Sequence, residues 1–360
     1  PLLGSSGGGR KNLVINGAMQ VAQRATSNTA QGSGYLTVDR IVYYNQGIDN
    51  DVTKAQVDIA AGTTPYTLGF RKAFKLTNGN QSSGAGAADI IEFGHKIEAQ
   101  DIANSGWNYT DPNSKITLSF WCKSSVAQNF NFFLVTSDGT AQSYPYETGS
   151  LSADTWTKIT KIIPGNSNLQ FDNNNGEGLF LNFPIFYGTN FTGSTNLNQW
   201  NTHSGSTRTP DQTSTWYTTN NATFEITGLQ LEVGDHATDF EFRSFNQELA
   251  LCERYCQVLV RGQQYFGTCM VYQSSINTAA MVWKTTMRAT PSIVANSGTN
   301  YYITYRNGGS NQYNALDGSL SLANENGGGV FTTGASGTQG HAGAMAGNNA
   351  GVLVYIQAEL

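Results

Sequence analysis

Apolar and polar residues alternate through much of the first 240 positions, which is the two-residue period of a β-strand with one buried face. The clearest case is the segment from 115 to 123. Its Ile116, Leu118 and Phe120 share one face, whereas Trp121 lies on the opposite face. The pattern predicts a half-buried strand here.

A second segment, 179–187, is apolar on both faces, which is typical of a strand in the middle of a β-sandwich. Pro184 within it cannot donate a hydrogen bond to a neighbouring strand, so it indicates an edge or a bulge. The apolar run at 13–22 predicts a further strand.

Between Phe224 and Val233 the apolar residues change parity. Phe224 and Ile226 are even-numbered, whereas Leu229 begins an odd-numbered set. A slip of one residue would turn half of these side chains toward water. Gly228 stands at the change and predicts a β-bulge, which would keep both sets on the core.

Ser244 and Gln247 have the spacing of a capping box, in which two residues satisfy each other's backbone groups at the start of a helix. They predict one helix over residues 245–260, with an apolar stripe wider than a surface helix needs. We expect this helix to be wedged between two β units as a rigid joint.

After the helix, shorter apolar segments predict a second, smaller β unit. A Gly-, Asn- and Ala-rich region, 324–349, has the composition of long loops or of segments ordered by neighbouring subunits. The expected strands are 265–272, 280–283, 301–305 and 351–358.

The predicted fold class is therefore all-β, with two antiparallel units and one connecting helix. The expected parts are a flexible Gly- and Ser-rich lead at 1–11, a β-sandwich at 12–243, the connecting helix at 244–261 and a C-terminal antiparallel β domain at 262–360.

Charged residues make up only 12% of the 360 residues, and the net charge is −5 without any basic cluster. Nucleic-acid binding is not expected, because it requires a cationic surface that neutralises phosphates. Membrane insertion is not expected either, since no apolar run approaches the roughly 20 residues that span a bilayer. The 17 Tyr, 18 Phe and 6 Trp supply ample material for a folded core.

Four cysteines are too few to stabilise a chain of this size through disulfides. Cys252 and Cys256 are spaced to share one helix face, but two further zinc ligands are missing nearby. We interpret all four as buried, reduced thiols, which suits assembly in a reducing cytoplasm.

The sequence contains none of the common catalytic or nucleotide-binding motifs. Glycan cleavage requires two carboxylates about 5–9.5 Å apart across a cleft, and no such pair stands out at strand spacing. Glu92 and Glu98 flank His95 in an undistinguished polar stretch. An oxygen-rich segment, 172–177, lacks the spacing of a calcium loop and is interpreted as a turn. We therefore expect no catalytic residues, no metal and no cofactor.

Sugar binding requires aromatic rings that stack on pyranose faces, with amide and hydroxyl groups beside them. The long loop at 190–221 supplies aromatic residues in a polar setting, and a second candidate lies near residue 107. The alternative is that the tryptophans only anchor the loop to the sandwich. The candidate glycan-stacking residues are Trp200, His203, Trp216, Tyr217 and Trp107.

Several blocks, in order along the chain, resemble bacteriophage tail-fibre and virion appendage proteins. The resemblance implies a jelly-roll, carbohydrate-binding-module-like sandwich followed by a small C-terminal β domain. It also implies a location on the virion, other virion proteins as partners, a homotrimer and contact with host cell-surface glycans. The blocks are 12–24, 39–40, 97–101, 116–124, 153–156, 224–234, 240–255, 287–291 and 358–360.

Three functions are compatible with these observations. The first is a non-enzymatic tail fibre or receptor-binding appendage that contacts host glycans, which the long aromatic loop favours. The second is a structural adaptor, decoration or head-fibre protein without a receptor role, favoured by the short N-terminal lead. The third is a polysaccharide depolymerase, which the missing carboxylate pair disfavours.

Overall fold

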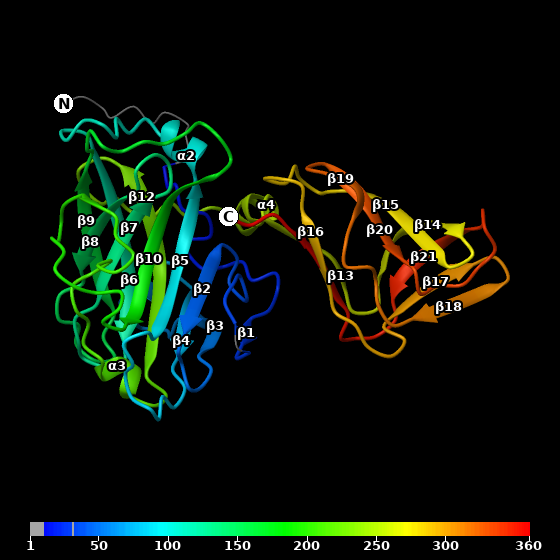
Figure 1. The fold of residues 1–360 in the computed structure, drawn as a ribbon, viewed down its shortest axis with the longest axis horizontal. Coiled ribbons are helices and arrows are strands. Elements are labelled where there is room, and N and C mark those ends of the chain that lie inside the picture. Colours follow the sequence, from blue (N-terminus) through cyan, green and yellow to red (C-terminus); the bar gives the residue numbers. More distant parts are fainter. Residues whose placement is uncertain (1–10, 31) are drawn as a thin grey trace. The chain divides into compact units, whose positions relative to one another are not determined.

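The computed structural model describes residues 11–30 and 32–360, so nearly all of the predicted lead at 1–11 lies outside the described residues. The described chain divides into two compact units. The first extends to Glu248 and includes the terminal Leu360, and the second comprises Leu249–Glu359. Antiparallel strands build both units (Figure 1).

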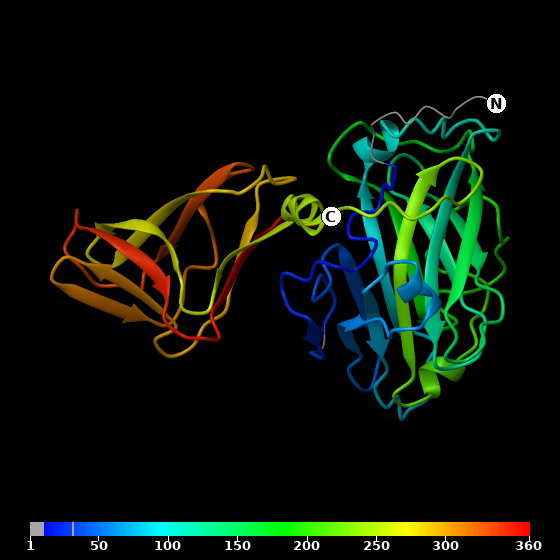
Figure 2. The same ribbon diagram turned by 180° about the vertical axis from the view of Figure 1, so that it is seen from behind.

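The first unit contains two six-stranded sheets, and the chain crosses between them repeatedly (Figures 1 and 2). In one sheet the order is β1-β3-β4-β12-β6-β9, and every neighbouring pair is antiparallel. Its strands are β1 (Ser27–Asn28), β3 (Thr53–Asp58), β4 (Lys72–Thr77), β12 (Thr223–Val233), β6 (Lys115–Ser124) and β9 (Thr157–Pro164).

The second sheet of this unit has the order β11-β8-β7-β10-β5-β2 and is also antiparallel throughout. The two sheets form the predicted jelly-roll-like β-sandwich. The strands are β11 (Asn201–Thr202), β8 (Gln142–Glu147), β7 (Asn131–Thr136), β10 (Glu177–Tyr187), β5 (Ile90–Glu98) and β2 (Ile41–Gln46).

Aromatic side chains from both sheets form the centre of the sandwich. The ring of Phe183 stacks on that of Phe93 at 5.1 Å between centroids, and Phe120 meets Phe183 edge-on at 5.4 Å. Phe132 packs against the same ring. Each fully buried phenyl group stabilises the fold by about 1.5–3 kcal/mol, so this cluster holds the two sheets together.

Two features of the predicted core strands are confirmed. Along β6 the residues Ile116, Leu118 and Phe120 are buried, whereas Trp121 on the opposite face is half-buried. The pairing of β12 with β6 shifts register between Thr227 and Gln230, which is the expected bulge. Val233 at the end of β12 is 41% exposed, so the apolar set leaves the core before that residue.

Gly228 lies inside this bulge with a φ of +64°, a conformation that suits glycine. A Cβ atom at this position would lie 2.7 Å from the Phe70 ring. The prediction from Pro184 is confirmed as well. Strand β10 is central in its sheet, and it shifts register against β5 between Pro184 and Phe186.

The predicted strand at 13–22 is wrong. This segment is irregular although largely buried, and Asn16 and Met19 adopt positive φ angles of 61° and 57°. Such left-handed residues interrupt an extended ladder. The segment is held mainly by side-chain bonds, in which the Asn16 amide donates to the carbonyls of Val21 and Asp39.

The predicted helix begins as expected but ends early. The backbone N–H of Ser244 donates to Gln247 Oε1 at 3.0 Å, and α4 covers Phe245–Glu253. The following residues form strand β13 (Cys256–Arg261), which pairs with β22 (Leu353–Gln357). The residues after Glu253 thus form a strand rather than a longer helix, because β22, about 100 residues further along the chain, pairs with them. Three short helices were not predicted: α1 (Thr64–Thr67), α2 (Ala99–Ala103) and α3 (Thr215–Thr218).

The second unit contains a three-stranded sheet, β13-β22-β16, and a seven-stranded sheet, β18-β17-β21-β14-β15-β20-β19. Its predicted strands at 265–272, 280–283, 301–305 and 351–358 overlap β14, β15, β17 and β22. The remaining bounds are β14 (Tyr265–Gln273), β15 (Ile276–Val282), β16 (Ser292–Ala295), β17 (Tyr302–Arg306), β18 (Gly309–Tyr313), β19 (Ser321–Asn324), β20 (Gly327–Thr332) and β21 (Ala342–Gly347).

The region 324–349 is not the loose loop that its composition indicated, because β20 and β21 lie inside it. Both are interior strands of the seven-stranded sheet. Its glycines permit close approach of neighbouring strands: a Cβ on Gly327 would lie 2.6 Å from the Met281 carbonyl oxygen, and one on Gly343 would lie 2.5 Å from that of Tyr305.

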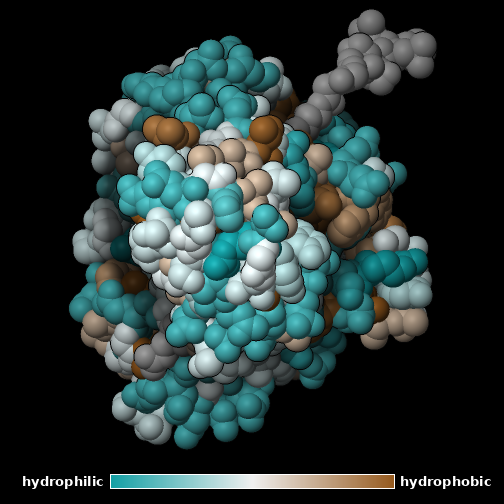
Figure 3. Space-filling model, turned by 90° about the vertical axis from the view of Figure 1, so that its right-hand side faces the viewer, coloured by the Kyte–Doolittle hydropathy of each residue, from teal (hydrophilic) through white to brown (hydrophobic). Residues whose placement is uncertain are grey.

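The surface visible in Figure 3 is mainly hydrophilic or neutral, with strongly apolar residues in separate areas. All four cysteines are buried, as predicted. Across residues 11–30 and 32–360 no cluster of three or more metal-binding side chains occurs. None of the helices in these ranges has the length and apolar character that crossing a bilayer requires.

Candidate functional site

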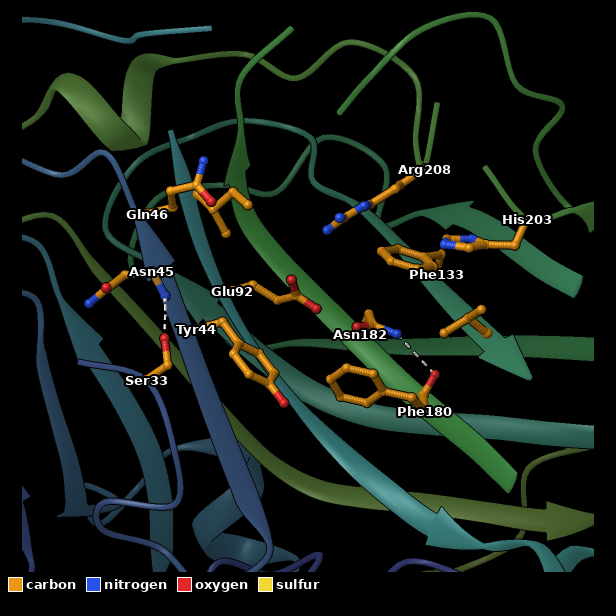
Figure 4. Close-up of a pocket in the computed structure, with 12 residues that line it drawn as sticks. Ser33, Tyr44, Asn45, Gln46, Glu92, Phe133, Phe180, Asn182, His203 and Arg208 are labelled. Atoms are coloured by element: carbon orange, nitrogen blue, oxygen red, sulfur yellow. Dashed lines mark hydrogen bonds between the residues drawn. The ribbon is translucent and has the colours of Figure 1, made fainter. Parts of the chain in front are cut away.

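A pocket of about 350 Å³ lies on the outer face of the sheet β11-β8-β7-β10-β5-β2, the face turned away from the sandwich core (Figure 4). We call it the outer-face pocket. It combines aromatic rings, amides and charged groups on adjacent strands, with two further residues supplied by the loop after β10. The residues that line it are Ser33, Tyr44, Asn45, Gln46, Ile90, Glu92, Phe133, Val135, Phe180, Asn182, His203 and Arg208.

Strand alternation places these side chains together. Glu92 on β5 lies opposite Tyr44 on β2 and opposite Pro184 on β10. Asn182 on β10 lies opposite Phe133 on β7. Because successive residues of a strand point to opposite faces, the neighbours of Glu92, Asn182 and Phe133 fill the core while these three side chains face outward.

Glu92 is the carboxyl group of the pocket, and only 4% of its surface is exposed. The hydroxyl of Tyr187 donates a hydrogen bond to Glu92 Oε2 at 2.5 Å. Burial raises the pKa of Glu92 to about 7, although this hydrogen bond and the nearby Arg208 and Lys96 act in the opposite direction. Glu92 therefore titrates near neutral pH.

Arg208 lies at the loop side of the pocket. Its Nε donates to the carbonyl oxygen of Gly205 at 3.1 Å, and Nη1 lies 3.4 Å from the Tyr187 hydroxyl oxygen. The guanidinium carbon lies 5.3 Å from the ring centre of Tyr187 and 5.0 Å from that of Phe191. No carboxylate in the described ranges forms an ion pair with Arg208.

His203 packs flat against Phe133, with 6.1 Å between ring centroids and 13° between planes. Burial and the nearby Arg208 charge lower the pKa of His203 below its ordinary value, so it is mainly neutral at pH 7. Its Nδ1 is buried without a hydrogen-bond partner among the described residues.

Two half-buried rings form the opposite side of the pocket. Tyr44 and Phe180 meet edge to face at 6.2 Å between centroids. Gly94 leaves room for the Phe180 ring, since a Cβ there would fall 2.3 Å from Phe180 Cε2. Lys96 lies 5.2 Å above the Phe180 ring, and its Nζ forms a 2.7 Å ion pair with Glu177.

Three of the five predicted stacking residues do not lie on the surface. Trp216, Tyr217 and Trp107 are 0%, 1% and 3% exposed, respectively, so their faces cannot meet a sugar. Trp216 Nε1 donates to the carbonyl of Thr223 at 3.0 Å, and the Tyr217 hydroxyl donates to Asp89 at 2.8 Å. These rings belong to the core, where burial of their apolar surface stabilises the fold.

Trp200 is half-buried and anchors the loop. Its Nε1 donates to the Pro164 carbonyl at 2.7 Å, and its ring meets Tyr144 edge-on at 5.4 Å. Of the predicted stacking residues, only His203 lines the outer-face pocket. Both Trp200 and Trp216 fasten the loop to the sandwich through their indole N–H groups.

Sequence reasoning missed most of the pocket. Phe180 and Asn182 lie on a strand whose two apolar faces were both assigned to the core, and Glu92 lies in a stretch that looked unremarkable. The available signal was Asn182, because an amide inside an otherwise apolar strand indicates a polar task on that face. Nothing local to Arg208 indicated that its loop folds back over the sheet.

No protein-family model and no curated protein matches this chain. Among solved structures, it is similar to the enzymatically active domain of tailspike protein 4 of bacteriophage CBA120, at 12% identity and a TM-score of 0.32, covering 62% of this chain and 21% of that one. It is also similar to a putative sugar binding protein from Bacteroides thetaiotaomicron, at 11% identity and a TM-score of 0.33, covering 62% of this chain and 100% of that one.

A third similar structure is a family 16 carbohydrate-binding module, at 14% identity and a TM-score of 0.26, covering 61% of this chain and 99% of that one. The chain thus spans about a fifth of the tailspike domain's length. Similarities with TM-scores this low do not show what the chain binds.

Proposed function

We propose that this chain is a bacteriophage virion protein, a tail fibre or receptor-binding appendage, whose first unit binds a host-surface glycan in the outer-face pocket. The observation that carries the glycan proposal is the composition of that pocket. Tyr44 and Phe180 line the pocket as half-buried rings that can contact the apolar side of a sugar, while Asn182 and Gln46 offer amides for its hydroxyls. Placement on adjacent strands keeps these groups in fixed register.

We further propose that binding occurs without cleavage. Hydrolysis of a glycosidic bond employs two carboxyl groups about 5–9.5 Å apart. Glu92 is the one carboxyl group among the residues that line the pocket. Incubating the protein with host polysaccharide and measuring reducing ends tests this point, and sustained, saturable release would overturn it.

The virion role is supported by the nine sequence blocks that resemble phage appendage proteins, including 224–234 and 240–255. A test is whether the purified protein labels host cells and blocks phage adsorption. If it does neither and is found on the particle away from the fibre tips, the structural adaptor role replaces the receptor-binding one.

The proposed homotrimer is supported by one face of the seven-stranded sheet in the second unit. The strand register places Tyr305, Ala344 and Thr268 side by side on this face. Its exposed side chains include Tyr265, Met270, Tyr272 and Val282, which are 67%, 48%, 55% and 86% exposed, and none is charged. Charge-depleted, aromatic-rich surface is typical of subunit interfaces.

The pocket assignment predicts that Phe180→Ala weakens glycan binding about fivefold or more, because truncating a side chain that is a main contact costs more than about 1 kcal/mol. Isothermal titration with the host glycan measures the effect. Phe245→Ala is the matched control, since it removes an exposed phenyl group outside the pocket. Equal losses in both variants would contradict the assignment.

A further inference from the structure

We propose that the outer-face pocket is selective for an acidic glycan, in which a sugar carboxylate is held by Arg208, and that Glu92 makes this binding dependent on pH. The inference rests on the glycan-binding function proposed above and specifies its ligand. It follows from the arrangement of charges in the pocket rather than from its shape.

Arg208 supplies a cation that forms no ion pair with a carboxylate of the described residues. Its Nε and Nη1 are directed to Gly205 and Tyr187, and its guanidinium carbon lies 5.3 Å from the ring centre of Tyr187 and 5.0 Å from that of Phe191. Its Nη2 makes no hydrogen bond to the described residues. A guanidinium group that is fixed in this way binds a carboxylate with little further loss of side-chain freedom.

The other cation beside the pocket is already neutralised. Lys96 forms its 2.7 Å ion pair with Glu177, and both are largely withdrawn from solvent. His203 contributes no charge at neutral pH, because burial and Arg208 lower its pKa. Arg208 is therefore the cation available to a ligand.

Glu92 decides the net charge that the ligand meets. From β10 it faces Tyr187, from β2 it faces Tyr44, from the loop it faces Arg208 and His203, and Lys96 lies along its own strand. Tyr187 stays protonated, because burial raises its pKa well above the ordinary value. Glu92, whose pKa is raised to about 7, therefore changes charge as the pH passes through neutrality.

These charges fix the direction in which affinity for an anion changes with pH. Below pH 7 Glu92 is mostly protonated, Arg208 is unopposed and the pocket attracts an anion. As the pH rises through 7, Glu92 gains a negative charge that repels the ligand carboxylate and offsets Arg208. Affinity for an acidic glycan therefore falls as the pH rises, whereas affinity for a neutral glycan does not.

The experiment uses immobilised pairs of oligosaccharides, each uronic-acid oligomer beside its carboxyl-reduced, neutral counterpart. We expect the chain of 360 residues to bind the acidic member of at least one pair about tenfold or more tightly than the neutral member at pH 6. Raising the pH to 8 should weaken this binding about threefold to tenfold, since a tenfold change corresponds to a ligand-induced shift of one pKa unit.

Two variants isolate the groups. Glu92→Gln keeps an oxygen acceptor for Tyr187 but cannot ionise, so the loss between pH 6 and 8 should disappear. Arg208→Gln should abolish the preference for acidic members while binding of neutral members persists. Thermal unfolding shows whether each variant is folded, and Arg208→Lys, which keeps the charge without the planar fork, should recover part of the preference.

The outcomes separate this inference from the function on which it rests. If carboxyl-reduced members bind as tightly as acidic ones, the pocket binds glycans but the acidic selectivity is wrong. An unchanged pH dependence in Glu92→Gln would overturn the role of Glu92. Failure of every pair, together with failure of whole host polysaccharide, would overturn the glycan function as well.

Discussion

At the scale of single residues, the pocket owes its properties to burial more than to residue type. Glu92 and Glu98 looked alike in the sequence, yet only Glu92 lines the pocket on the outer face of β5. Its neighbour Tyr187 is equally inconspicuous in a strand rich in aromatic residues. Desolvation raises the pKa of the Glu92 carboxyl group to about 7, although the hydrogen bond from the Tyr187 hydroxyl favours the charged form.

This burial has a consequence for stability. The pKa of Glu92 rises from 4.5 toward about 7 on folding, so the folded state holds its proton more tightly than the unfolded state. The contribution of Glu92 to stability therefore falls as the pH rises from about 4.5 to 7 and stays low above that. The total loss is up to about 3 kcal/mol.

We predict that Glu92→Gln, which cannot ionise, is more stable than the natural chain at pH 8 and loses this advantage near pH 5. Denaturant unfolding at the two pH values measures the difference. Glu147→Gln is a suitable control, because it removes a carboxyl group from the same sheet outside the pocket. A pH-independent difference for Glu92→Gln would contradict the titration near neutrality.

At the scale of elements, β12 shows how one glycine lets even-numbered and then odd-numbered apolar residues of the same strand point into the core. The bulge at Gly228 returns Leu229 and Leu231 to the core after Phe224 and Ile226. The change of parity can be recognised from the sequence because the residues involved lie close together along the chain. By contrast, the end of α4 and the strands β20 and β21 depend on partners far along the chain.

Gly228→Ala tests the bulge. The positive φ costs about 1 kcal/mol for an L-residue, and the new methyl group meets the Phe70 ring at 2.7 Å. We expect a loss of about 2–4 kcal/mol in the free energy of unfolding.

Gly62→Ala is the matched control, since Gly62 also has a positive φ of 85° but no atoms within 4 Å of the added Cβ. It should cost only the backbone term, about 1 kcal/mol. Equal losses in chemical denaturation would mean that the contact with Phe70 contributes nothing.

At the scale of the whole molecule, the chain separates its two proposed tasks. The first unit carries the outer-face pocket, and the second carries an uncharged sheet face suited to association between copies. Both surfaces lie on sheets, where side-chain positions are set by strand register. The proposed receptor-binding role thus depends on side chains held in fixed positions.

Association through the second unit predicts that Met270→Arg with Val282→Arg converts an oligomer to a monomer, because buried unpaired charges oppose assembly. Light scattering during gel filtration measures the mass. Leu68→Arg in the first unit, at a residue that is 51% exposed, should leave the oligomer intact. A natural chain that is already monomeric at micromolar concentration would refute the homotrimer proposal.

The sequence alone determined the properties that depend on neighbours along the chain: the all-β character, the faces of β6, the bulge at Gly228 and the cap at Ser244. These follow from a period of two residues or from contacts within one turn. Only the tertiary structure decided which aromatic residues are exposed, so that Trp216 is core while Tyr44 faces the pocket. The reason is physical: burial, and with it the titration of Glu92, depends on which distant strand or loop covers each face.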